Sequence, residues 1–214
     1  MLDPALVEKL KSLLESLESD YTLSLRPSGH ARQAELEELA RSLAGVSPRL
    51  TVSVEGPPIE GVALSLNKDG ASTGVAFEGV PGGNEFSSLV LALLNADGKG
   101  KLPDEDIRRR VQQLKGPLSL RTFVMLNCAS CPDVVQSLNQ LALLNPGLQH
   151  TMVDGDMAME EAVRRGVLAV PSVFLGDKLV HVGRADLQRL VQALEQHAGT
   201  ENSNGPGGGS AGPG

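Results

Sequence analysis

The chain has 214 residues, of which 41% are hydrophobic and 2% aromatic, and its net charge is −7. That length can form one large or two small domains with a sizeable core, which must be aliphatic because there is no tryptophan and only one tyrosine. The negative charge and the lack of a basic cluster argue against nucleic acid or an anionic membrane as the main partner.

The N-terminal residues have no basic segment followed by an apolar run, and no apolar run reaches the roughly 18 residues of a membrane span. We therefore expect no secretory signal and no membrane segment. The chain has two cysteines, Cys128 and Cys131. In a chain without a signal, such a pair points to the cytoplasm, where it is more often catalytic or metal-binding than structural.

The first half predicts helix, strand, helix, three strands and a helix. Leucines from Leu2 to Leu17 recur at helical spacing, and Asn67-Lys68-Asp69-Gly70 has the composition of a hairpin turn. The last of these helices, EFSSLVLALL, is unusually apolar. The predicted segments are residues 2–17, 21–25, 31–44, 50–54, 62–66, 74–79 and 85–94.

A polar hinge at 95–103 and a charged helix at 104–114 follow, and the same pattern then recurs. The predicted segments of the second half are strand 118–126, helix 132–144, strand 149–154, helix 157–165, strands 172–175 and 179–182, and helix 185–196. Each half gives strand, helix, strand, hairpin and helix, which is the element order of a thioredoxin or glutaredoxin unit. In the first half, the turn that matches the cysteines is Pro27-Ser28-Gly29-His30, which has no thiol.

We therefore predict an α/β fold of two tandem thioredoxin-like (glutaredoxin-like) units packed as one module, with central mixed β-sheets flanked by helices. Residues 1–97 form the unit without cysteines, and residues 98–198 form the unit with the redox site. Residues 199–214 are rich in glycine and proline and cannot bury enough apolar surface to offset the entropy of ordering. We expect this tail to be a disordered linker.

The sequence Cys128-Ala129-Ser130-Cys131 lies between a predicted strand and a predicted helix. A Cys-x-x-Cys pair can be a redox dithiol, half of a zinc site or a haem attachment site. Haem attachment needs histidine at position 132, which is proline, and zinc needs about four ligands, whereas the four histidines show no suitable spacing. We therefore predict a redox dithiol and no metal.

The two thiols have different predicted roles. Cys128, placed at or near the cap of the helix, attacks a partner disulfide as a thiolate that the helix N-terminus stabilises. Cys131 then resolves the mixed disulfide. Ala129 and Ser130, inside the turn, are expected to contact the substrate.

Val170-Pro171 precedes a predicted strand. In thioredoxin-like folds, a cis proline at this place lies against the cysteine turn and offers its backbone to the substrate. We expect Pro171 to be cis and Val170 to contact the substrate. The alternative is a trans proline that opens an edge strand.

Glu85 opens the apolar helix of the first half. By itself it is typical of a first-turn acid favoured by the helix dipole. A functional role requires the two halves to pack so that Glu85 approaches the cysteines. Its carboxylate, with a raised pKa, could then exchange a proton with Cys131. Asp133 is predicted to be an ordinary first-turn partner of the dipole.

Four blocks of sequence carry a resemblance to a known family: CPDVVQSLNQLALLNP at 131–146, GGNEFSSLVLALL at 82–94, HTMVDGD at 150–156 and GVLAVPSVFLGDK at 166–178. They resemble the N-terminal domain of the flavoprotein (F) subunit of alkyl hydroperoxide reductase, and the likeness covers roughly residues 1–197. The resemblance implies two fused thioredoxin-like folds with the redox pair only in the second.

In that family, electrons pass from an FAD-containing module, reduced by NAD(P)H, through this domain to the disulfide of a peroxiredoxin, the C subunit. The resemblance makes Cys128 the interchange nucleophile, Cys131 its resolving thiol, Pro171 the cis proline and Glu85 the acid near the disulfide. The chain has no Gly-x-Gly-x-x-Gly between a predicted strand and helix, and no second Cys-x-x-Cys. We therefore expect it to bind neither FAD nor NAD(P)H, which belong to a separate or missing reductase module.

Two other functions are compatible with the residues. The first is a free-standing thioredoxin- or glutaredoxin-like protein disulfide reductase of broad specificity, which would reduce insulin or small disulfides. The second is a binding or redox-sensing module whose dithiol only switches between two states. Such a module would have a reduction potential near the cytosolic value and would not catalyse exchange.

Overall fold

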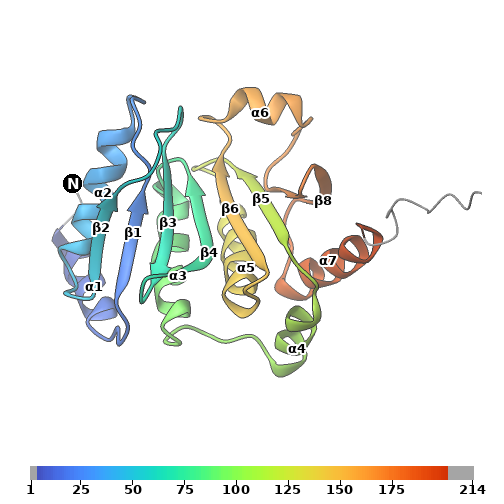
Figure 1. Cartoon of the computed structure of the whole chain (residues 1–214), viewed down its shortest axis with the longest axis horizontal. Helices are drawn as coiled ribbons and strands as arrows, with labels where there is room; N and C mark the ends of the chain where they lie inside the picture. Colours follow the sequence, from blue (N-terminus) through green and yellow to red (C-terminus); the bar gives the residue numbers. More distant parts are fainter. Residues whose placement is uncertain (1–3, 202–214) are drawn as a thin grey trace, which may run out of the picture.

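In the computed structural model, which describes residues 4–201, one mixed sheet of eight strands forms the centre of the molecule (Figure 1). The strand order is β2-β1-β3-β4-β6-β5-β7-β8. The strands are β1 (Tyr21–Leu25), β2 (Leu50–Val54), β3 (Ala63–Lys68), β4 (Ala71–Glu78), β5 (Leu118–Val124), β6 (Leu148–Asp154), β7 (Ser172–Leu175) and β8 (Lys178–Val182).

Helices cover this sheet, and α3 and α5 lie side by side behind it in Figure 1. The helices are α1 (Pro4–Leu14), α2 (Gln33–Ala44), the 3-10 turn η1 (Gly83–Glu85), α3 (Phe86–Ala96), α4 (Glu105–Gln113), α5 (Cys131–Leu144), α6 (Met159–Arg164) and α7 (Leu187–Glu201). Every predicted helix and strand is present. The start of the first predicted helix and residues 202–214 of the predicted tail lie outside the described residues, while 199–201 belong to α7.

The two halves repeat the same strand arrangement. In the first, β1 pairs in parallel with β2 and antiparallel with β3, which pairs antiparallel with β4. In the second, β5 pairs in parallel with β6 and antiparallel with β7, which pairs antiparallel with β8. This topology confirms the prediction of two thioredoxin-like units packed as one module.

The two units share a single sheet, a feature that the sequence pattern does not predict. Strand β4 pairs in parallel with β6, from Val75 opposite His150 to Glu78 opposite Val153. The pairing satisfies backbone groups that an edge strand would leave open. The fourth strand of the first unit therefore becomes an interior strand, and the two units are held in a fixed relation.

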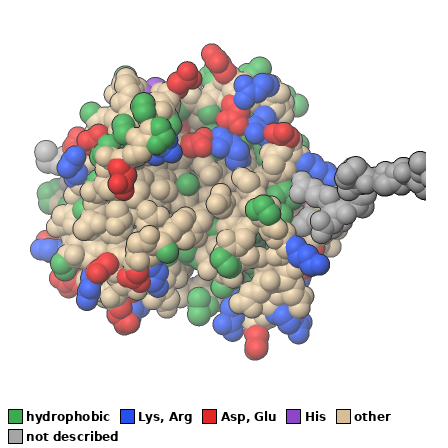
Figure 2. Space-filling model, in the orientation of Figure 1, with side chains coloured by type: hydrophobic (Ala, Val, Ile, Leu, Met, Phe, Trp, Pro, Cys, Tyr) green, Lys and Arg blue, Asp and Glu red, His purple; other side chains and the backbone are tan. Residues whose placement is uncertain are grey.

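The core is aliphatic, as the composition predicts, and a single cluster of buried side chains extends through both units. It includes Leu23, Leu66 and Leu93 from the first unit and Leu120 and Leu138 from the second. On the face in Figure 2, charged side chains of both signs gather along the rim. None of the helices within residues 4–201 combines the length and the apolar character that a membrane crossing requires.

Beneath α5, a histidine is fully buried. His150 Nδ1 lies 2.7 Å from Asn139 Oδ1, and its Nε2 lies 2.9 Å from Thr122 Oγ1. Because the amide oxygen can only accept, Nδ1 carries the proton and Nε2 accepts from the hydroxyl. The imidazole thus ties α5 to β5 and β6 as a neutral group, and burial lowers its pKa to about 3.

We expect His150 to make the fold acid-sensitive. Its pKa is about 3 in the folded chain against an ordinary value of 6.5, so its stabilising effect is full above pH 6.5 and is lost as the pH falls toward 3. Between pH 7 and pH 5, the free energy of unfolding should fall by roughly 2 kcal/mol from this cause. Urea unfolding at pH 7 and pH 5 should show a larger loss for the wild type than for His150→Gln, and equal losses would contradict this assignment.

Candidate redox site

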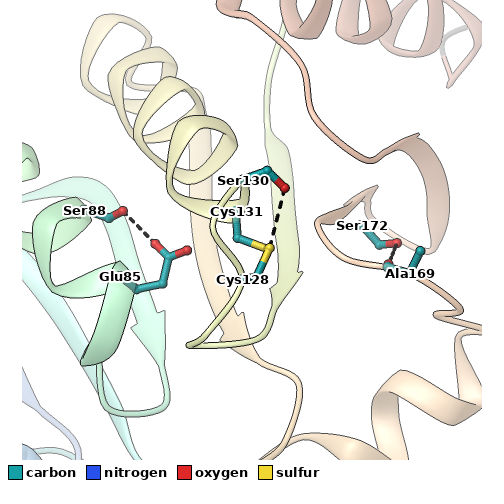
Figure 3. Close-up of a disulfide and its surroundings, with 7 residues drawn as sticks. All are labelled: Glu85, Ser88, Cys128, Ser130, Cys131, Ala169 and Ser172. Carbon is teal, nitrogen blue, oxygen red and sulfur yellow. Dashed lines mark hydrogen bonds between the residues drawn. A yellow bond between two sulfur atoms is a disulfide. The ribbon is translucent and has the colours of Figure 1, made fainter.

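Cys128 and Cys131 form a disulfide between the end of β5 and the start of α5, with their Cα atoms 5.5 Å apart (Figure 3). Cys131 is the first residue of α5 and is fully buried, whereas Cys128 is partly exposed. Pro132 fits the first turn of α5, because N–H groups in a first turn have no acceptor within the helix and the missing proline N–H therefore costs no hydrogen bond. Of the two sulfurs, only that of Cys128 is therefore accessible to a partner protein.

Helix α5 begins at Cys131, one residue before the predicted start at 132, and Cys128 lies near its cap. Ser130 is the N-cap, and Cys128 lies two residues before it. A tight turn precedes the helix, in which the Cys128 N–H donates to Met125 O over 2.9 Å. Cys128 reaches the helix N-terminus through its sulfur, which is bonded to Cys131, and the hydroxyl of Ser130 lies 3.7 Å from that sulfur.

The Val170–Pro171 peptide bond is cis, as predicted. Ser172 pairs with Phe123 of β5, so the preceding Pro171 lies beside the end of β5 from which the cysteine turn departs. The Ser172 hydroxyl donates to Ala169 O over 2.7 Å and fixes the loop around the proline. Of the residues predicted to contact substrate, Ala129 is exposed and Ser130 and Val170 are partly exposed.

Glu85 approaches the disulfide from the first unit. It ends η1 and is the N-cap of α3, its side chain is fully buried, and in Figure 3 its carboxyl group faces the cysteines. Ser88 Oγ donates to Oε2 over 2.6 Å, while Oε1 has no hydrogen-bond partner. Burial raises the pKa of Glu85 to about 7, although the Ser88 hydrogen bond acts in the opposite direction. An acid that only stabilised the helix dipole would lie in solvent, whereas Glu85 is buried.

The two residues before Glu85 also contact the redox unit, a feature that the sequence pattern did not reveal. The Asn84 N–H donates to Leu126 O over 3.0 Å. Gly83 has a φ of +54°, and a Cβ there would lie 2.6 Å from Leu126 O. The pair Gly82-Gly83 was the available sequence signal, because a left-handed glycine often marks a close backbone approach.

The thiol-free turn of the first unit is paired with its own chain. Ser28 forms a parallel bridge with Ile59, and the Ile59 N–H donates to Pro27 O over 3.0 Å. Near the redox turn, exposed Asp133 forms an ion pair with Arg184 over 3.0 Å. Among residues 4–201, no three His, Cys, Asp or Glu side chains gather as ligands for a metal ion.

Comparison of the sequence with known proteins gives consistent matches. A model of the thioredoxin domain matches residues 122–195, within the unit that carries the disulfide. The chain is 34% identical over 203 residues to the F subunit of alkyl hydroperoxide reductase of Pseudomonas putida, covering 95% of this chain and 39% of that protein. It is 37% identical over 194 residues to the F subunit of the Staphylococcus aureus enzyme, covering 91% of this chain and 38% of that protein.

Solved structures show the same fold. The NTD_N/C domain of alkylhydroperoxide reductase AhpF from Enterococcus faecalis superposes with a TM-score of 0.85 at 23% identity, covering 91% of this chain and all of that one. A protein disulfide oxidoreductase from Aeropyrum pernix gives 0.82 at 19% identity, covering 94% and 96%. The chain thus spans about two fifths of the length of the curated relatives it matches and nearly all of the Enterococcus domain.

Gly83→Ala should destabilise the protein more than a matched glycine substitution does. Both Gly83 and Gly98 have positive φ, but a Cβ at Gly98 would meet nothing within 4 Å. Gly98→Ala should therefore show only the left-handed penalty of roughly 1–2 kcal/mol. At Gly83 the clash with Leu126 O should add about 1–3 kcal/mol. Urea unfolding of the oxidised proteins measures both, and equal losses would mean that the contact with the cysteine turn is unimportant.

Glu85→Gln should stabilise the oxidised protein at high pH. The pKa of Glu85 is raised from 4.5 to about 7, so the folded state disfavours the ionised form and the wild type loses stability as the pH rises from 4.5 through 7. Between pH 4.5 and pH 8, the free energy of unfolding of the variant should therefore rise by roughly 3 kcal/mol relative to that of the wild type. Urea unfolding at both values tests this, with exposed Glu55→Gln as the control. A gain independent of pH would contradict it.

Proposed function

We propose that this chain, which is homologous to the N-terminal domain of the alkyl hydroperoxide reductase flavoprotein, is a thiol–disulfide oxidoreductase that relays electrons from a flavin-containing reductase module to a peroxiredoxin. The observation that carries the proposal is the asymmetric disulfide. Cys128 is accessible, Cys131 is buried, and a buried carboxyl group of the other unit faces them. This arrangement supplies an attacking thiol, a resolving thiol and a proton acceptor.

In the forward direction, the Cys128 thiolate attacks one sulfur of the partner disulfide. A bond forms between Cys128 and that sulfur, the partner's S–S bond breaks, and the second partner sulfur leaves as a thiolate. Cys131 loses its proton and attacks Cys128, which closes the Cys128–Cys131 disulfide and releases the first partner sulfur. The dithiol is oxidised by two electrons, the partner disulfide is reduced, and two protons pass in total to the partner thiolates.

Glu85 acts in the second step. Cys131 is fully buried and has no direct route to solvent for its proton. A carboxylate whose pKa lies near 7 can take that proton at neutral pH and give it up again once Cys131 is oxidised. The unpartnered Oε1 is the atom that would accept it.

The substrate is held beside this pair. We assign backbone contacts with the partner to Pro171 and Val170, and contacts from inside the turn to Ala129 and Ser130. The exposure of Ala129 and the partial exposure of Ser130 and Val170 support this assignment. The working units are residues 1–97 and 98–198, and their boundary falls in the segment between α3 and α4.

We assign the reductant to a module outside the described residues. Among residues 4–201 there is no Gly-x-Gly-x-x-Gly between a strand and a helix, where a dinucleotide would need it. FAD and NAD(P)H therefore belong to the reductase module that regenerates the Cys128–Cys131 dithiol. We assign the reaction to the cytoplasm, and the Cys-x-x-Cys pair supports this assignment because exchange between dithiols and disulfides is the common role of such a pair there.

A second candidate is a free-standing protein disulfide reductase of broad specificity. The same absence of a dinucleotide motif favours it, since such a protein receives electrons from a separate reductase or from glutathione. The two candidates share the chemistry at Cys128 and Cys131 and differ in their partners. Reduction of insulin with thioredoxin reductase or glutathione, at rates close to those with a peroxiredoxin, would favour the second candidate.

Reconstitution with a flavin reductase and a C-subunit peroxiredoxin tests the relay. Cys128→Ser should abolish peroxide turnover because no nucleophile remains, and Cys131→Ser should accumulate a mixed disulfide that gel electrophoresis without reductant detects. Ser137→Ala, on the same helix but away from the turn, should keep wild-type turnover. Unchanged turnover in Cys128→Ser would refute the proposed function.

A further inference from the structure

The carboxyl group of Glu85 has two oxygens in unlike surroundings. Oε2 accepts a hydrogen bond of 2.6 Å from Ser88 Oγ, and Oε1 is buried without a partner. A buried acceptor without a partner is costly, so the carboxyl group needs an external constraint to keep this orientation. The proposed role of Glu85 depends on that orientation, because Oε1 is the oxygen left for the cysteines.

The constraint comes from a short chain of hydrogen bonds that joins both units. Ser88 is one turn after Glu85 on α3 and is fully buried. Gln136, on α5, donates from Nε2 to Ser88 Oγ over 3.4 Å and to Ser87 Oγ over 3.2 Å. A hydroxyl has a single proton. Since Gln136 occupies an acceptor position of Ser88, that proton is directed toward Glu85.

We propose that Ser88, oriented by Gln136, is a positioning residue that holds Oε2 of Glu85 and thereby presents Oε1 to the disulfide. The inference rests on the proposed function, because it assigns Ser88 a role through Glu85. Gln136 and Cys131 lie on the same helix. The carboxyl group is therefore fixed to the element that carries the buried sulfur, although the two belong to different units.

The same hydrogen bond stabilises the ionised carboxylate. Ser88 lowers the pKa of Glu85 against the larger effect of burial. In the oxidised protein the sulfurs of Cys128 and Cys131 are joined in a disulfide and do not titrate, and Asp133 of α5 is exposed and paired with Arg184. Loss of the Ser88 donor should raise the pKa of Glu85 by about one unit. At pH 7 the ionised fraction would then fall about fivefold.

Ser88→Ala should therefore slow the resolution step at pH 7 by about fivefold and shift its pH profile toward alkaline values, with wild-type rates restored above pH 9. The carboxyl 13C signal of Glu85 in the oxidised full chain measures the titration directly and needs no turnover. Ser87→Ala is the matched control, because Ser87 accepts from the same amide but donates its proton to Asn84 O and not to Glu85. Gln136→Leu keeps the Ser88 hydroxyl without its orienting donor and should give a smaller shift of the same sign.

Identical titration of Glu85 in wild type, Ser88→Ala and Gln136→Leu would overturn the proposal, as would an equal shift in Ser87→Ala. If Ser88→Ala does not fold, Gln136→Leu alone tests the proposal, by whether the pKa of Glu85 shifts in that variant. Failure of the underlying function has a different signature. Glu85→Gln would then leave the rate of resolution unchanged, while the carboxyl titration of the wild type would still respond to Ser88.

Discussion

Four residue pairs join β4 to β6 in parallel, and the redox site depends on this join. Because the crossover from β4 leads into η1 and α3, the pairing brings the start of α3 beside the start of α5. Gly83, Asn84 and Glu85 then contact or face the segment around the cysteines. The unit without thiols thus supplies one wall of the site, and neither unit alone contains all of its parts.

Under the proposed function, the buried carboxyl group of Glu85 makes the site a compromise between stability and chemistry. An acid with no charged partner and one unpaired oxygen destabilises the ionised protein, yet the same burial brings its pKa into the range where it can both take and release a proton. A more stable replacement would lose this property. Such conflicts between local stability and function are usual at active sites.

Local sequence was sufficient for part of this description. The Cys-x-x-Cys turn and the order of elements follow from residue types and spacing that act over short distances, whereas the cis bond at Pro171 was expected from the place of this proline in thioredoxin-like folds. Cys128 was expected at or near the cap of the helix, and it lies two residues before the N-cap, Ser130.

Other features depend on contacts between segments distant in the sequence. The burial of Glu85 and its bond chain through Gln136 exist only once the two units share a sheet, and no periodicity within either unit encodes that join. The same holds for His150. In the sequence it is one of four histidines without a motif, and only the packing of α5 over β6 makes it a buried link.

The paired turn of the first unit has a consequence for where exchange takes place. At the place that corresponds to the cysteines, Pro27 O already accepts the Ile59 N–H, and Ser28 is bridged to the same residue. A visiting chain cannot pair with backbone groups that are taken by the protein's own loop. Under the proposed function, exchange is therefore confined to the turn of the second unit, although the fold is duplicated.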